Sequence, residues 1–189
     1  MLSISNDGLD IGERILGAAA SCVVDFGVDR VTLAEIARRA GVSRPTVYRR
    51  WPDTPSVVAA LLTQHVTRVM REAPLHGDDR ESLVQQMVTV ANLLRRDELV
   101  MSVLHSQLAS IYITERLGAS QQMLIDALAE RLRAAQRHGS VRAGDPLQMA
   151  TMVLLIAQST IQSEQIVRPI LDADALATEL AYSLNGYLS

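Results

Sequence analysis

Residues 31–52 read VTLAEIARRAGVSRPTVYRRWP, and this stretch sets the architecture that we expect for the whole chain. Thr32 can cap a short helix that begins at the next residue, and Glu35 three positions later completes a capping box. Gly41 then ends that helix and supplies the backbone freedom of a tight turn. Ser43 can cap a second short helix that follows at once. Two short helices joined in this way predict a helix-turn-helix.

The second helix of the pair has one apolar side and one polar side. Val47 and Trp51 are four positions apart, so they share the side that packs on the core. Arg44, Thr46 and the polar residues that follow are left for the outer side. An exposed helix of this kind fits the major groove of DNA, where arginine can pair with guanine and threonine can meet a thymine methyl.

These residues resemble the DNA-binding domain of the tetracycline-repressor (TetR) family, and the resemblance extends upstream through Ile15, Ala18, Ala19, Phe26 and Gly27. It covers about residues 10–62 and implies an all-helical regulator that binds double-stranded DNA. The residues that the resemblance assigns to DNA contact are Thr32, Ser43, Arg44, Pro45, Thr46, Tyr48, Arg49 and Thr54.

Within this set the resemblance implies different roles. Thr32 would donate to a phosphate, and Tyr48 would reach the backbone, which sets register rather than sequence. Arg44 and Thr46 are the candidates for base contacts. The family commonly has a lysine at the start of the next helix, but here Asp53-Thr54-Pro55 has no basic residue. One charged phosphate contact per subunit is therefore expected to be missing, with a shallower salt dependence of binding.

The charge distribution also favours DNA binding at this place. All 18 basic residues are arginine, and the chain carries a net charge of −3. Residues 30–50 contain six arginines and one acid, a net charge of +5, so the remainder carries −8. A basic segment in an acidic chain is a local electrostatic footprint. The alternative is that these arginines only keep one face hydrated.

The composition indicates a globular, cytoplasmic protein with no membrane partner. Apolar residues make up 48% of the chain and aromatic residues 3%, so aliphatic side chains and Met must fill the core. The one cysteine, Cys22, lies in an apolar pattern and is expected to be buried in a reducing compartment. No secretory signal is visible, and the longest apolar stretch, 149–157, is too short to span a bilayer.

Helical periodicity throughout the chain predicts an all-α fold of about nine helices. A loose arm at 1–9 and three helices would form a DNA-binding domain, residues 1–53. A helical ligand-binding and dimerisation domain would follow, residues 54–189. The expected helices cover 10–26, 33–40, 44–50, 54–71, 80–95, 97–112, 115–138, 145–168 and 173–188.

The last two helices are the candidates for a homodimer interface. The stretch 147–161 is apolar almost all round, and leucines recur every fourth position after 176, flanked by alanines. Two such helices from each subunit would form a four-helix bundle, which lets the dimer bind a palindromic operator. Burial within one subunit is the alternative. The predicted interface residues are Leu154, Ile161, Leu176, Leu180 and Leu184.

The middle helices should enclose a pocket for a small-molecule effector. Because few aromatic residues follow Tyr48, an aromatic cage for a cation is not expected, and a mostly apolar ligand fits better. His105 could instead be an ordinary core histidine, and Gln158 and Gln162 could pair across the dimer. The candidate ligand-binding residues are Met101, His105, Gln107, Tyr112, Met123, Met152, Gln158 and Gln162.

The patterns of an enzyme are missing from the sequence. The four histidines are scattered, and there is no glycine-rich phosphate loop and no nucleophile elbow. We therefore expect no catalytic residue, no metal site and no cofactor. The predicted function is a repressor that a ligand releases from its operator. The alternative is a dimeric helical interaction module that has lost DNA binding.

Overall fold

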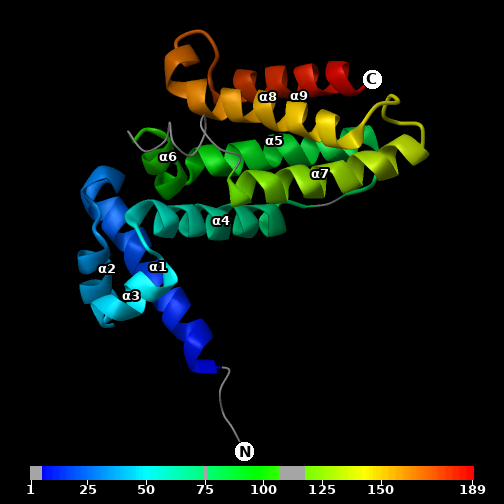
Figure 1. The fold of residues 1–189 in the computed structure, drawn as a ribbon. Coiled ribbons are helices and arrows are strands. Elements are labelled where there is room, and N and C mark those ends of the chain that lie inside the picture. The colour runs from blue at the N-terminus through cyan, green and yellow to red at the C-terminus, as the bar shows by residue number, and fades with distance from the viewer. Residues whose placement is uncertain (1–5, 75, 107–117) are drawn as a thin grey trace, which may run out of the picture. The chain divides into compact units, whose positions relative to one another are not determined.

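A computed structural model describes residues 6–74, 76–106 and 118–189 of the chain. In these ranges the chain folds into α-helices and one 3-10 helix, with no strand, which confirms the all-α prediction (Figure 1). No helix in the described part is both long and apolar enough to cross a membrane. The elements are α1 (Asn6–Phe26), η1 (Val28–Arg30), α2 (Leu33–Ala40), α3 (Arg44–Arg50), α4 (Thr54–Glu72), α5 (Arg80–Arg96), α6 (Glu98–Leu104), α7 (Ala119–Arg137), α8 (Pro146–Val167) and α9 (Ala173–Leu188).

The helices form two compact units. The first unit lies within Met1–His65 and Glu98–Gly118, and the second lies within Val66–Asp97 and Ala119–Ser189. Helix α4 therefore contributes residues to both units, and α6 belongs to the first. These units are defined by packing, and their bounds differ from the expected boundary after residue 53. The functional division into 1–53 and 54–189 stays a prediction.

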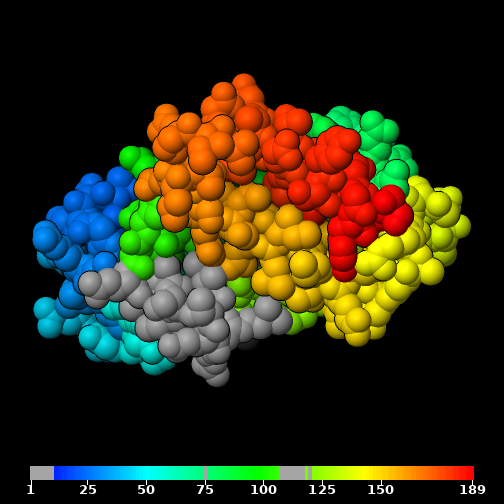
Figure 2. All heavy atoms as spheres, turned by 90° about the horizontal axis from the view of Figure 1, so that it is seen from above, coloured from blue at the N-terminus to red at the C-terminus, as the bar shows by residue number. Residues whose placement is uncertain are grey.

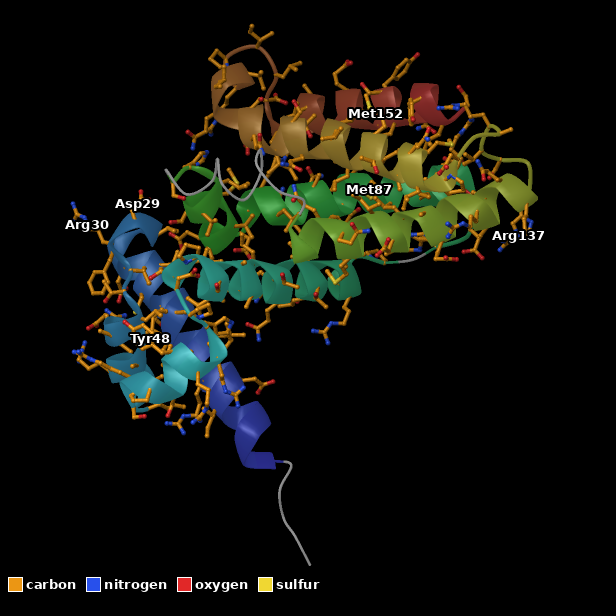
Figure 3. The ribbon with its side chains drawn as sticks, in the orientation of Figure 1. Asp29, Arg30, Tyr48, Met87, Arg137 and Met152 are labelled. Atoms are coloured by element: carbon orange, nitrogen blue, oxygen red, sulfur yellow. The ribbon has the colours of Figure 1, made fainter. Side chains whose placement is uncertain are left out.

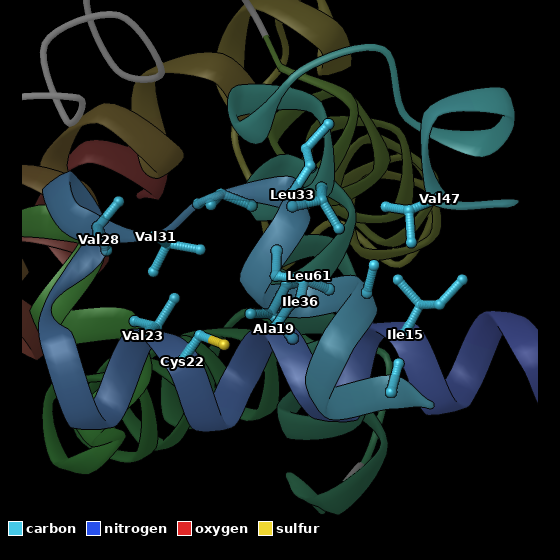
Figure 4. Packing of buried hydrophobic residues seen from close by; sticks show 14 of the residues in the cluster. Ile15, Ala19, Cys22, Val23, Val28, Val31, Leu33, Ile36, Val47 and Leu61 are labelled. Carbon is cyan, nitrogen blue, oxygen red and sulfur yellow. The ribbon is translucent and has the colours of Figure 1, made fainter. Parts of the chain in front are cut away.

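The core of the first unit is built on α1. Ile15, Ala19 and Cys22 recur at helical spacing and are fully buried, and α2, α3, the start of α4 and α6 pack around them (Figure 4). This confirms the expected burial of Cys22. Leu99 and Val103 of α6 join the same cluster although they are far away in sequence. The helix-turn-helix thus stands on a continuous aliphatic core.

The second unit is a helical bundle. Helix α5 contacts α7, α8 and α9, and α8 also packs along both α7 and α9 (Figure 1). Arg142 ties the loop before α8 to the end of α9, because its Nε donates to the Tyr187 carbonyl at 2.8 Å and its guanidinium lies 4.7 Å from the Tyr187 ring centre. Figure 2 shows that α8 and α9, in orange to red, lie at the surface on one face of this unit.

Three local expectations need correction. Helix α1 begins at Asn6, so 6–9 are helical rather than part of an arm. The helical spacing of Ile15, Ala19, Cys22 and Phe26 predicts one buried face, but Phe26 is 43% exposed. It is in the last turn of α1, where the Arg39 guanidinium covers its ring at 4.6 Å. Helix α6 ends at Leu104, well before residue 112. Residues 107–112 of that predicted helix lie outside the described residues, as does 115–117 of the next.

Candidate nucleic-acid interface and effector cavity

The turn between α2 and α3 is built from local hydrogen bonds that the sequence predicts. The Thr32 hydroxyl accepts from the Glu35 amide at 3.2 Å and caps α2. Gly41 has φ 64° and ψ 34°, the left-handed conformation that favours glycine. The amide of Val42 donates back to the Ala37 carbonyl at 3.1 Å, and this bond closes the end of α2. The abrupt end of α2 lets α3 start after only three intervening residues.

Helix α3 is anchored by Val47 and presents polar side chains to solvent. Val47 is 0% exposed, and the Ser43 hydroxyl caps the helix by accepting from the Thr46 amide at 3.3 Å. Tyr48 is 51% exposed and is labelled in Figure 3. Trp51 packs half-buried against the core, as expected. Of the predicted DNA contacts, Thr46 and Thr54 are half-buried, and the exposed ones are Thr32, Ser43, Arg44, Pro45, Tyr48 and Arg49.

Two of the six arginines in the basic segment are neutralised. The Glu35 carboxylate accepts from Arg38 at 2.7 Å and from Arg39 at 3.1 Å. These hydrogen bonds, the one from Arg38 first, lower the pKa of Glu35 from 4.5 to about 2. Arg39 also donates to Asp25 at 2.5 Å. The net charge of +5 counted along 30–50 therefore overstates the positive field, because Asp25 lies outside that stretch.

The start of α4 differs from the expected arrangement. Thr54-Pro55 has the pattern of a helix cap followed by a first-turn proline, but the Asp53 carboxylate takes the capping role by accepting from the Ser56 amide at 2.7 Å. The Thr54 hydroxyl instead donates to the Val31 carbonyl at 3.5 Å. An acidic cap thus stands where the family resemblance implies a basic residue, and the hydroxyls of Thr54 and Ser56 both make hydrogen bonds inside the fold.

The second unit contains a cavity of about 650 Å³. Its walls come from α4, α5 and α7, and most of its lining atoms are apolar. Met87 of α5, labelled in Figure 3, is one of the buried lining residues. The lining residues are Thr67, Met70, Arg71, Ala73, Pro74, Gln86, Met87, Val90, Met123, Leu124, Ala127, Leu128 and Arg131.

Among the predicted ligand-binding residues, Met123 is the one that lines this cavity. Met101 and His105 belong to the first unit, where His105 is exposed, so the alternative of a core histidine is wrong. Met152 is exposed on α8. Gln107 and Tyr112 lie outside the described residues.

The two predicted glutamine ligands both belong to α8, in the second unit. Gln158 accepts from Gln121 of α7 at 3.2 Å, a contact within one subunit. The side-chain nitrogen of Gln162 is buried without a hydrogen-bond partner. Neither residue lines the cavity.

Two polar side chains that line the cavity, Gln86 and Arg131, were not among the predicted ligand contacts. A signal was present, because Leu124, Leu128 and Arg131 are spaced four and three positions apart and so share one face of α7. Nothing in that spacing tells which helix faces them.

The predicted dimer residues are all buried within a single chain. They pack α8 and α9 into the subunit, and their place in an interface stays a prediction. The large apolar side chains that α8 and α9 leave exposed are Leu147, Met152, Leu155, Ile166 and Tyr182, and Tyr182 is 80% exposed. The residues buried within one subunit are Leu154, Ile161, Leu176, Leu180 and Leu184.

The comparison with known proteins agrees with these features. Residues 15–61 match the family described as bacterial regulatory proteins, tetR family. An HTH-type transcriptional regulator of Mycobacterium tuberculosis is 71% identical over 188 residues, which cover 100% of both chains.

Two solved structures have the same fold. The transcriptional repressor QsdR of R. erythropolis, from the TetR family, has a TM-score of 0.70 at 17% identity, over 97% of this chain and 98% of that one. The regulator FadR of Bacillus subtilis, in complex with stearoyl-CoA, has a TM-score of 0.67 at 18% identity, over 94% and 99%. With the α2–α3 geometry and the relative that is 71% identical over its whole length, these matches show that the chain belongs to the TetR family of DNA-binding transcriptional regulators.

Proposed function

We propose that this regulator acts as a homodimer on a palindromic operator and that a small, mostly apolar effector releases it from DNA. The observation that carries the proposal is the polar outer face of α3 on its buried Val47 anchor. Arg44 and Tyr48 are exposed there, and a rigid aliphatic core supports the helix from behind. Arg44 and Thr46 are our candidates for base contacts, and Thr32 and Tyr48 for the backbone.

The homodimer is supported by the exposed apolar surface of α8 and α9. Met152 and Leu155 are three positions apart, so they share one side of α8, and Tyr182 adds an aromatic ring on α9. Large apolar side chains gathered on a surface favour association. We expect Leu155→Asp to give a monomer in analytical ultracentrifugation. Ile170→Asp is the matched control, because Ile170 is 87% exposed against 54% for Leu155 but follows the end of α8. A dimer that survives Leu155→Asp would move the interface elsewhere.

The cavity supports the effector part of the proposal. Its volume of about 650 Å³ lies within the usual range of small-molecule sites. Its methionines are flexible and fill irregular space, so they can adapt to an aliphatic ligand. A ligand that binds one conformation of the dimer better than the other shifts the population and lowers affinity for DNA.

Selection from a pool of random duplexes tests DNA recognition directly. We expect a palindromic consensus, and recovery of no enriched sequence at low salt would favour the interaction-module alternative. Arg44→Ala should weaken binding to the selected site by about 1–3 kcal/mol per base contact and relax specificity at that position. Arg137→Ala removes the same charge from the exposed end of α7 in the second unit (Figure 3) and should leave affinity unchanged. Equal effects of the two variants would contradict the assignment of Arg44.

A further inference from the structure

The residues that line the cavity in the second unit determine the chemistry of the apolar part of a bound ligand. Met87 and Val90 come from α5, and Met123, Leu124 and Leu128 come from α7. The lining residues in the described part of the chain offer aliphatic and thioether surface and include no aromatic ring. Such a surface binds a flexible aliphatic chain through area removed from water and gives no platform for stacking a flat ring. The body of the ligand is therefore expected to be aliphatic.

One charged side chain, Arg131, enters this apolar wall from α7. Its Nη1 donates to the Gln86 side-chain oxygen, and its Nη2 donates to the Gly77 carbonyl at 2.8 Å. Its Nε is buried and has no hydrogen-bond partner among the described residues. Both partners are neutral oxygens, so the positive charge of the guanidinium is solvated but not balanced. Arginine has five N–H donors, and these two bonds use only two of them.

No acidic side chain in the described part of the chain makes an ion pair with Arg131. The Asp79 carboxylate is occupied by the Ser82 amide at 2.9 Å and the Ser82 hydroxyl at 3.1 Å. Asp78 is exposed to solvent. Burial lowers the pKa of Arg131, and the charges of Asp78 and Asp79 act in the opposite direction. A partly buried cation without a direct counter-charge is costly, and an anion in the adjoining cavity would relieve that cost.

We propose that the cavity binds an amphipathic carboxylate, an aliphatic chain that ends in a single anionic group, with the carboxylate held by Arg131. The inference rests on the proposed function and names the chemical class of its effector. A single partly buried guanidinium matches a monoanion, and a carboxylate can accept from both of its Nη groups. Arg71 also lines the cavity but is exposed, so it adds positive charge where the cavity meets solvent.

Arg131 also has a structural role, since it joins the loop at Gly77 to α5 and α7. A purely structural arginine would change stability but would not discriminate between ligands of the same shape. The informative measurement is therefore a ratio of affinities. Isothermal titration calorimetry on the full-length protein should compare decanoate with decan-1-ol, which has the same chain and no charge. We expect decanoate to bind about tenfold to a hundredfold more tightly, the usual gain from a hydrogen bond to a charged group.

Three variants separate the possibilities. Arg131→Met keeps an unbranched apolar stem without the charge and should remove the preference for decanoate while decan-1-ol still binds. Arg133→Met, on the same helix, should keep the preference, because Arg133 is exposed and pairs with Glu130 at 2.5 Å. Ala127→Phe fills the cavity and should abolish the binding of both compounds. This last variant tests the location of the site even if Arg131→Met does not fold.

The outcomes also distinguish this inference from the proposed function. Equal affinity for decanoate and decan-1-ol, or a preference that survives Arg131→Met, would overturn the carboxylate assignment and leave an apolar effector site in place. Binding of both compounds to Ala127→Phe would overturn the location. Absence of binding of either compound to the wild-type protein would overturn the ligand class. DNA binding is measured separately on the selected operator, and its loss in the wild-type protein would contradict the proposed function itself.

Discussion

Substitution of Gly41 by alanine should destabilise the first unit by about 1 kcal/mol, although it adds only one methyl group. Gly41 has φ 64° and ψ 34°, and a residue with a Cβ is about 1–2 kcal/mol less favourable in that conformation. The added Cβ would lie 3.4 Å from Arg14 Nη2, an ordinary contact, so no clash adds to this cost. Alanine also restricts the unfolded chain, which offsets about 0.4–1 kcal/mol. The net change raises the unfolded fraction about fivefold.

Gly17→Ala is the matched control, because the same substitution should have the opposite sign there. Gly17 lies inside α1, and an added Cβ would meet nothing within 4 Å. Alanine in a helix is about 1 kcal/mol more favourable than glycine, so this variant should be more stable than the wild type. Both positions belong to the first unit, so a single probe reports on both.

Urea unfolding monitored by tryptophan fluorescence measures the two effects. Trp51 is the one tryptophan of the chain and packs against the core of the first unit. The far-UV circular dichroism transition must be followed in parallel, because a chain of two units can depart from two-state behaviour. Gly41→Asn should recover part of the loss, since asparagine tolerates the left-handed conformation. The reasoning is refuted if Gly41→Ala and Gly17→Ala shift the midpoint in the same direction.

Three further outcomes follow from the first unit. Thr54→Lys should tighten operator binding and steepen the plot of log affinity against log salt by about one per subunit, and an unchanged slope would contradict the idea that a phosphate contact is missing. The pKa of Glu35 is lowered to about 2 by Arg38 and Arg39, so its stabilising effect is present above its unfolded value of 4.5 and is lost as the pH falls through about 2. Acid unfolding of Glu35→Gln should therefore depend less on pH in that window, and identical acid profiles would argue against it. Burial raises the pKa of the Cys22 thiol, so iodoacetamide should modify it only as fast as the unit opens, whereas native protein that reacts as fast as free cysteine would disprove this.

The helix-turn-helix was predictable because the interactions that determine it are local in sequence. The capping of α2 by Thr32, the positive φ of Gly41 and the capping of α3 by Ser43 all depend on residues within a few positions of one another. Val47 was also assigned correctly to the buried side, since a short helix with polar neighbours has one apolar side to bury. Asp53 was missed as the cap of α4 because aspartate and threonine are both good caps, and the pattern does not choose between adjacent candidates.

The dimer and effector residues could not be predicted in the same way. Periodicity shows that Leu180 and Leu184 lie on one apolar face of a helix. Such a face can be buried either by a neighbouring helix of the same chain or by a second subunit, and the periodicity does not distinguish the two. The exposed side chains of Leu155 and Tyr182 became visible only once the first partner of each helix was known. The leucines of the repeat are buried within one subunit, and the residues that we propose for the interface, such as Leu155 and Tyr182, are not part of the repeat.

The local sequence thus determined the all-α class, the helix-turn-helix and the polar face of α3. Capping, glycine conformation and helical periodicity depend on residues only a few positions apart. The packed structure was needed for features that join distant segments: the pairing of Asp25 with Arg39, the neutral partners of Arg131 and the cavity beside it. The physical reason is that a cavity and an unbalanced charge are properties of all the side chains that meet at one place. Their volumes and charges sum only after the helices have packed.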